Sequence, residues 1–334
     1  MRSARIVEPM RIEIEDVDIP EVKTGQILIK NKYTGICGSD FPFFLNQRQM
    51  NYPLPPGDPG HECIGTVIQS RCSEYKEGDN VLALPLSARG FAEYFLSVPF
   101  VTVRLPDREL RKELVLAQTL GTVIHACRKI FLSTLRSPET ETLDINIELW
   151  DMSGVKVGIV GQGSIGMLFT MMMKSMGADT VVGIDLMEYR LNIAKKIGAS
   201  HTVNRAQLDF VKDVREISKG NMLDLVVEAV GSSKAVNDCI SLTRRKGMVL
   251  VFGVPRENNY DLQFNEFFRK ELNLVAAVGP HVPTDFPEAV KFVEHNIEDI
   301  SQIISHVLPL ENIQKAFEMA IQRSDNALKI LLEF

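Results

Sequence analysis

A glycine-rich turn set between a strand and a helix constrains this chain more than any other feature. Gly161, Gly163 and Gly166 follow the apolar run 155–160 and precede a stretch of good helix formers. In this context the first glycine permits a tight turn, the second lets the backbone approach a pyrophosphate, and the third lets the helix pack closely on the strand. The helix N-terminus adds N–H groups and a partial positive charge. The turn therefore predicts a dinucleotide site; the alternative is three structural glycines in some other α/β protein.

The chain beyond this turn alternates between strand and helix. Apolar strands are expected at 180–184, 223–228 and 247–252, with helices from about Ser164 and through Ala194. Such alternation is typical of βαβ units, in which consecutive strands lie parallel in one sheet. We therefore predict an α/β domain with a parallel sheet in this half of the chain.

An acidic residue stands where a ribose would lie. Asp185 ends the second of these strands, 19 positions after Gly166, and a carboxylate there can accept hydrogen bonds from both ribose hydroxyls. This favours NAD over NADP, because a 2′-phosphate would face a like charge, although Arg190 nearby weakens the argument. The remaining residues that we assign to cofactor binding open the helix or follow later strands: Ser164, Ile165, Val230, Gly253 and Val278.

The first third of the chain has a different residue pattern. From about residue 5 to 105, short β-type runs are separated by Gly and Pro, without helical periodicity. Apolar residues at helical spacing return over 111–130, so we expect a helix to lead out of a first domain there. A length of 334 residues also favours two domains. The tail from about 285 has two helical stretches and can return to the first domain. The acidic segment 135–152 is interpreted as a surface insertion or hairpin.

Four scattered residues of the first domain have the chemistry of an open zinc site. Cys37, His61, Glu62 and Gln118 offer a thiolate, an imidazole and oxygen donors. Neighbouring strand residues point to opposite faces, so Glu62 reaches the same metal as His61 only if the backbone is irregular there; otherwise it supports the site from outside. Each residue alone has an ordinary explanation, the cysteine as a small buried hydrophobe and the His-Glu pair as a surface pair.

Composition excludes several classes of function. A net charge of −6 argues against a nucleic acid partner, which normally requires a basic surface. We expect no signal peptide and no membrane partner, because the densest apolar stretch, 165–176, is too short to span a bilayer and contains Lys174. The five cysteines are odd in number and scattered, as expected of reduced thiols in a cytoplasmic protein.

Six motifs in order resemble the zinc-dependent medium-chain dehydrogenase/reductase family, and most nearly its sorbitol, threonine and glucose dehydrogenase branches. The resemblance implies a GroES-like, β-rich catalytic domain of residues 1–120 and 281–334 and a doubly wound Rossmann domain of residues 121–280. It implies one catalytic Zn²⁺, with Cys37 and His61 as ligands, Glu62 as ligand or outer support, and Gln118 at the third-ligand position. The motifs are 35–40, 60–62, 78–81, 90–94, 161–166 and 228–231.

The chain departs from the family pattern in three places. Many relatives carry glutamate or cysteine where Gln118 stands, and a neutral amide holds zinc less firmly while leaving it a stronger Lewis acid. The lobe of four cysteines that holds a structural zinc is missing between Val81 and Gly90, so no second zinc is expected. Pro42 replaces a histidine that often relays the proton, which leaves Ser39 to start that route.

The resemblance implies reversible, NAD-dependent oxidation of a secondary alcohol, such as a polyol or sugar, to its ketone. Ser39 would take the proton outward and Asp40 would support the site. Relatives form homodimers or homotetramers through an edge strand, for which the run 272–278 is a candidate. The alternatives are an NAD-binding regulator or scaffold that has lost catalysis, and an epimerase or lyase that uses NAD without net redox. Residues expected to set substrate specificity, or simply to pack, are Phe41, Phe43, Phe44, Asn46, Arg48 and His281.

Overall fold

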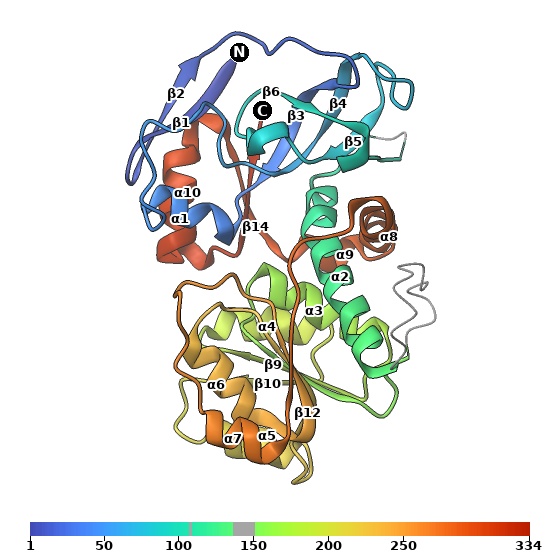
Figure 1. Ribbon diagram of the computed structural model, residues 1–334, viewed down its shortest axis with the longest axis vertical. Helices are drawn as coiled ribbons and strands as arrows, with labels where there is room; N and C mark the ends of the chain where they lie inside the picture. The colour runs from blue at the N-terminus through green and yellow to red at the C-terminus, as the bar shows by residue number, and fades with distance from the viewer. Residues whose placement is uncertain (107–108, 136–150) are drawn as a thin grey trace. The chain divides into compact units, whose positions relative to one another are not determined.

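The computed structural model describes residues 1–106, 109–135 and 151–334, so the predicted insertion at 135–152 lies almost wholly outside the described residues. The described chain divides into two compact units, shown in Figure 1. The first comprises Met1–Gly121 and His281–Phe334, and the second comprises Thr122–Pro280. None of the described helices is long and apolar enough to cross a membrane.

The first unit is built around a mixed sheet of strands from both ends of the chain. Among the described residues its order is β14-β15-β3-β4-β5-β7, with β6 also paired to β3 and a separate β1-β2 ribbon. Strand β15 runs antiparallel to β3, so the last strand lies beside one of the first. The strands are β1 (Arg2–Glu8), β2 (Arg11–Asp16), β3 (Ile27–Gly35), β4 (Glu62–Ser70), β5 (Asn80–Ala83), β6 (Tyr94–Ser97), β7 (Thr102–Arg104), β14 (Ile304–Pro309) and β15 (Lys329–Glu333).

Aromatic side chains pack two helices of the first unit against each other in its core. The ring centroid of Phe317 lies 6.4 Å from that of Phe41, 5.2 Å from that of Phe44 and 5.7 Å from that of Phe91. Phe41 and Phe44 thus contribute buried area to the core, which favours packing over substrate reading for these two residues. The helices are α1 (Phe41–Phe44), α8 (Val282–His295), α9 (Ile297–Ser301) and α10 (Ile313–Gln322), with 3₁₀ turns at Gly38–Asp40, Leu86–Ala88, Pro99–Val101, Lys112–Val115, Leu310–Asn312 and Ser324–Asn326.

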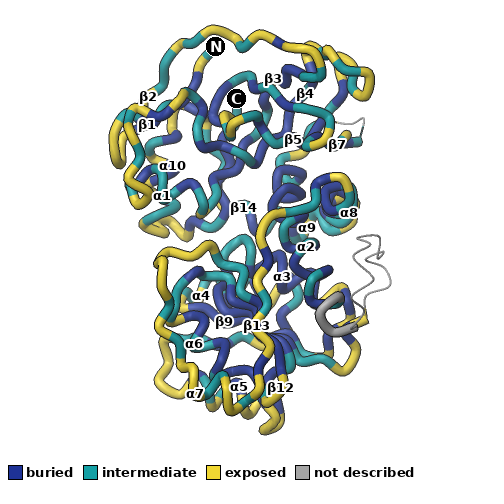
Figure 2. The backbone as a smooth tube through the Cα atoms, in the orientation of Figure 1, coloured by how far each residue is buried: buried dark blue, intermediate teal, exposed yellow. Residues whose placement is uncertain are grey.

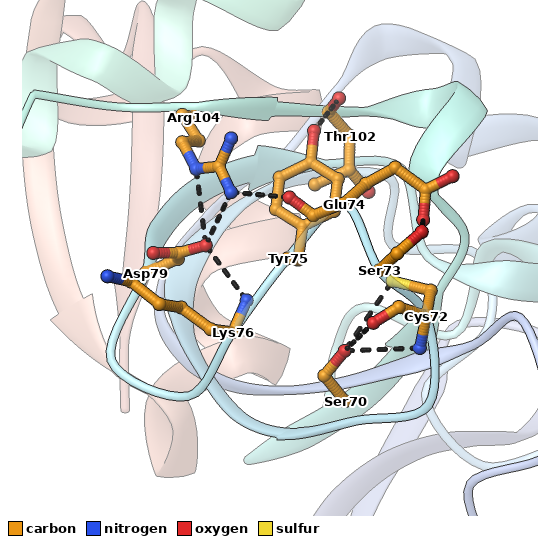
Figure 3. A network of polar contacts seen from close by, with 9 residues as sticks. All are labelled: Ser70, Cys72, Ser73, Glu74, Tyr75, Lys76, Asp79, Thr102 and Arg104. Carbon is orange, nitrogen blue, oxygen red and sulfur yellow. Dashed lines mark hydrogen bonds and ion pairs between the residues drawn. The ribbon is translucent and has the colours of Figure 1, made fainter.

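The motif at 78–81 has a structural role, which Figure 3 shows. Asp79 accepts the backbone N–H of Lys76 at 3.0 Å and pairs with the guanidinium of Arg104 at 3.1 Å. Arg104 also lies 5.0 Å from the ring centroid of Tyr75, whose hydroxyl donates to the carbonyl of Thr102 at 2.5 Å. These contacts tie the turn between β4 and β5 to β7, so this motif supports the sheet rather than the chemistry.

The second unit is a parallel sheet, which confirms the predicted α/β class. Its described strands follow the order β10-β9-β8-β11-β12-β13, and every pairing is parallel. The order reverses between β8 and β11, which makes this the topological switch point where such sheets bind ligands. In Figure 2 the inner strand β9 is buried, whereas the edge strand β13 is largely exposed. They are β8 (Lys156–Val160), β9 (Thr180–Asp185), β10 (His201–Asn204), β11 (Leu223–Glu228), β12 (Thr243–Val251) and β13 (Asn273–Ala276).

The helices lie largely where the sequence predicts them, and one of them begins later than expected. The helix expected over 111–130 begins later, at Leu116, because Lys112–Val115 forms a 3₁₀ turn before it. Helix α3 begins at Ser164, directly after the glycine turn. The helices are α2 (Leu116–Leu135), α3 (Ser164–Ser175), α4 (Glu188–Ile197), α5 (Phe210–Ile217), α6 (Ser233–Leu242) and α7 (Phe264–Lys270).

Candidate metal centre and dinucleotide turn

A short turn aims the thiol of Cys37. This residue lies between β3 and the 3₁₀ turn Gly38–Asp40, and its backbone N–H donates to Oδ2 of Asp40 at 2.9 Å. The N–H of Asp40 in turn donates to the carbonyl of Cys37 at 3.1 Å. Asp40 is fully buried, so these reciprocal bonds fix the turn where no water competes for them.

The imidazole of His61 is oriented from its Nδ1 side. Nδ1 lies 3.0 Å from the carbonyl oxygen of Pro59 and 3.2 Å from Oδ1 of Asp40. Because a carbonyl can only accept, Nδ1 carries a proton, and Nε2, which lies 3.4 Å from Oγ of Ser39, is the nitrogen left to bind a metal ion. Burial would lower the pKa of His61, but Asp40 outweighs burial and raises that pKa well above the usual range.

Glu62 forms a buried ion pair that the sequence did not predict. Its Oε2 contacts the ammonium of Lys329 on β15, and neither side chain is more than 2% exposed. Burial opposes both charges, yet their mutual attraction prevails: Lys329 lowers the pKa of Glu62, and Glu62 raises the pKa of Lys329. A Cβ at Gly35 would overlap Oε2 of Glu62 and reach the Cε of Lys329 at 2.9 Å, so glycine leaves the space for this pair.

The structure brings three of the four predicted metal ligands together. One donor atom each from Cys37, His61 and Glu62 lie within 4.8 Å of one another. Oε1 of Glu62 is buried without a hydrogen-bond partner in the described part of the chain. A soft sulfur, an imidazole nitrogen and a carboxylate oxygen form a donor set that fits Zn²⁺. Gln118 lies in the first turn of α2 and is 7% exposed.

Steric contacts give the glycines of the dinucleotide turn separate roles. Gly161 has a φ of +94°, and a Cβ there would lie 2.6 Å from Cγ2 of Val230. A Cβ at Gly166 would overlap the carbonyl oxygen of Gly161, so the third glycine allows the close helix packing. A Cβ at Gly163 would meet nothing within 4 Å, which leaves open space above this peptide. A ligand can therefore approach the backbone at Gly163.

The carboxylate of Asp185 is held in place at the end of β9. Its Oδ2 accepts the N–H of Gln162 at 2.7 Å, and its Oδ1 accepts the N–H of Met187 at 2.9 Å. Nη1 of Arg190 lies 3.8 Å from Oδ2, and the Arg190 side chain is 12% exposed. Each oxygen keeps a further lone pair, so the carboxylate can still accept hydroxyl groups.

The other predicted cofactor residues share one edge of the sheet in the second unit. Ser164 and Ile165 open α3, which starts beyond the carboxyl end of β8. Val230, Gly253 and Val278 follow the carboxyl ends of β11, β12 and β13, and Val278 is 87% exposed. Parallel strands present these ends together, where open α/β sheets bind ligands.

Comparisons with known proteins agree with this fold. The chain matches the alcohol dehydrogenase GroES-like domain over residues 23–98 and the zinc-binding dehydrogenase family over 164–295. It is 25% identical to the sorbitol dehydrogenase of Bacillus subtilis, covering 99% of this chain and 97% of that protein. It is 26% identical to the D-arabitol-phosphate dehydrogenase of Enterococcus avium, covering 95% and 92%. The crystal structure of galactitol-1-phosphate dehydrogenase from Escherichia coli superposes with a TM-score of 0.84 at 20% identity, covering all of both chains.

Proposed function

Because the chain belongs to the zinc-type medium-chain dehydrogenase family, we propose that it catalyses the reversible, NAD-dependent oxidation of a secondary alcohol to a ketone. The cluster of Cys37, His61 and Glu62 is the observation that carries this proposal. The relatives named above are dehydrogenases, which gives no support to a regulator, scaffold, epimerase or lyase.

We assign Cys37 and His61 as the permanent metal ligands and Glu62 as a conditional one. When bound, Zn²⁺ supplies Lewis-acid polarisation that lowers the pKa of an alcohol hydroxyl, and NAD accepts the hydride. Lys329 neutralises Glu62 and holds its Oε2, which weakens the carboxylate as a competing ligand. Gln118 stays our candidate for the neutral third ligand, and we propose a single zinc per chain.

Ser39 is the proposed first carrier of the substrate proton. Its Oγ lies 3.4 Å from Nε2 of His61, so the hydroxyl is within reach of the proposed metal ligands. A hydroxyl can accept one proton while donating its own, which suits a relay. Asp40 is fully buried and holds both Cys37 and His61, so we assign it a supporting role rather than a place in the relay.

NAD is the proposed cofactor in preference to NADP. The fixed carboxylate of Asp185 at the end of β9 supports this choice, because it offers acceptors to ribose hydroxyls and repels a 2′-phosphate. The partial burial of Arg190 beside Asp185 supports it further, since its charge is already engaged by that carboxylate. A Kd for NADPH equal to that for NADH would contradict this assignment.

The substrate that we propose is a polyol, a sugar or a related polar metabolite, because two of the relatives named above act on sorbitol or a pentitol phosphate. We also propose that two copies pair through β13, giving a homodimer or homotetramer. This strand is one of the two edge strands of the described parallel sheet, and the exposed Leu274 lies on it. A cytoplasmic location is consistent with five cysteines that are all free thiols.

Metal analysis followed by a substrate screen tests the proposal. We expect the purified protein to hold about one zinc per chain at the three-donor cluster. Polyols, sugars and their phosphates would then be tested with NAD for NADH absorbance. A chelator should abolish turnover, and added zinc should restore it. Bound zinc without NADH formation from any alcohol would contradict the proposed reaction.

A further inference from the structure

A buried glutamate joins two turns at the carboxyl edge of the parallel sheet. Glu228 is the last residue of β11 and is fully buried. Its Oε1 accepts the backbone N–H of Val230 at 2.8 Å and that of Gly231 at 2.7 Å. One carboxylate oxygen therefore fixes the turn that leads into α6.

The same residue also holds the turn that follows β12. Its backbone carbonyl accepts the N–H groups of Phe252 and Gly253, each at 3.0 Å. A Cβ at Gly253 would lie 2.8 Å from Oε2 of Glu228 and would overlap the backbone nitrogen of Gly231. Oε2 has no hydrogen-bond partner within the described residues. The carboxylate thus lies between two turns, which contact each other at Gly231 and Gly253.

These turns support the glycine turn where we place the dinucleotide. A Cβ at Gly161 would lie 3.0 Å from the carbonyl oxygen of Ala229, so the peptides on either side of the switch point are in contact. The N–H of Ala229 donates to the carbonyl of Val160, the residue before Gly161, at 2.9 Å. A shift of the turn after Glu228 would therefore displace the backbone that precedes Gly163.

A buried carboxylate is a costly way to close a turn, since the neutral side chains of Ser or Asn can satisfy turn N–H groups without the burial of a charge. Burial raises the pKa of Glu228, against the opposing effect of the N–H groups that it accepts. Retaining a costly group at the switch point points to a role beyond folding. We propose that Glu228 is a positioning residue for the dinucleotide: its carboxylate holds the N–H groups of Val230 and Gly231 and lies against Gly253, and so keeps the backbone beneath the Gly161 turn rigid. This inference rests on the proposed function.

Three variants of Glu228 and one matched control test the role. E228A removes the acceptor from two buried N–H groups, E228D withdraws it by one methylene while keeping the charge, and E228Q keeps an oxygen at the same reach. V249A is the control, because Val249 on β12 is fully buried in the same core but contributes no turn contact. For each we would measure NADH affinity by fluorescence titration, KM for NAD and for the alcohol, zinc content and Tm.

We expect E228A to weaken NADH binding about tenfold or more, with unchanged zinc content and an alcohol KM within about twofold of wild type. The NADH affinity of E228D should lie between those of wild type and E228A, and E228Q should retain most of the wild-type affinity. V249A should lower Tm and leave NADH affinity intact.

NADH affinity of wild-type strength in E228A would overturn the inference. So would a loss of affinity in V249A as large as that in E228A. If E228A does not fold, the comparison of E228D with E228Q decides, and equal affinities would overturn it. Failure of the wild-type protein to bind NADH would instead refute the proposed function itself, which is a different result from normal binding by the variants.

Discussion

The metal cluster and the dinucleotide turn are built by opposite means. The metal cluster and the cation beside it consist of charged or reactive side chains: Cys37 and His61, which are partly exposed, and the buried pair of Glu62 and Lys329. The turn consists of backbone N–H groups and three missing side chains, with Gly163 facing open space. Removing side-chain atoms should therefore impair metal binding at the cluster, whereas adding side-chain atoms should impair dinucleotide binding at the turn.

The largest effect is expected from removing the thiol. In Cys37→Ala the metal loses its softest ligand, and we expect zinc content to drop to background and turnover to fall by about a thousandfold or more. Metal analysis and NADH production measure both. Cys72→Ala is the control, since that thiol lies in the turn between β4 and β5 beside Ser70. Full zinc content in Cys37→Ala would remove Cys37 from the site.

The next effect comes from breaking the buried ion pair. Lys329→Met leaves the Glu62 carboxylate buried without its cation, which should lower the free energy of unfolding by about 3–5 kcal/mol. Lys32→Met breaks an exposed pair with Glu333, at 2.8 Å on the same sheet, and should cost about 0–1 kcal/mol. Urea unfolding of the metal-free variants gives both values. Equal costs would show that the buried pair is no more important than the surface one.

A smaller effect is expected from adding one methyl group to the turn. Gly163→Ala should fold like wild type, because its φ is −73° and its Cβ has open space, but should bind NADH about tenfold more weakly by filling the approach to the phosphates. Gly166→Ala should lose stability as well, because its Cβ overlaps the carbonyl of Gly161. Calorimetric titration and thermal unfolding separate the two. Unaltered NADH affinity in Gly163→Ala would place the phosphates elsewhere.

The smallest expected effect depends on pH and is a gain in stability. Burial raises the pKa of Asp58 to about 6, against the attraction of Arg89 and with help from the charge of Asp40. The folded state therefore binds this proton more tightly than the unfolded state, and stability falls as pH rises from about 4 to about 6. Asp58→Asn removes that penalty, so its Tm should exceed that of wild type by about 1–3 °C near pH 8 and match it near pH 4. A constant difference across pH would contradict the titration.

Local chemistry could be predicted from the sequence, whereas pairing across the chain could not. Gly161, Gly163 and Gly166 act within one turn, and the strand expected at 155–160 is β8 at Lys156–Val160. The partner of Glu62 was missed because it depends on the register of β15 against β3. The only signal in the sequence is Lys329 itself, a charge inside the otherwise apolar run 327–332. Glu228 was identified only as part of a motif. The two turns that it joins are brought together by the order of the strands in the sheet, and hydrophobic periodicity does not specify that order.

The position of β15 in the chain also determines when, during synthesis, Glu62 gains its cation. Strand β3 pairs with β15, and Lys329 is the group that neutralises Glu62. During synthesis the residues of β3 and β4 emerge early, and the whole parallel-sheet unit follows before Lys329 does. The nascent first unit therefore lacks the cation that neutralises Glu62 until Lys329 has been synthesised. A zinc ion that arrived during that interval would meet Glu62 as a free carboxylate, so metal loading and the final folding step are expected to be coupled.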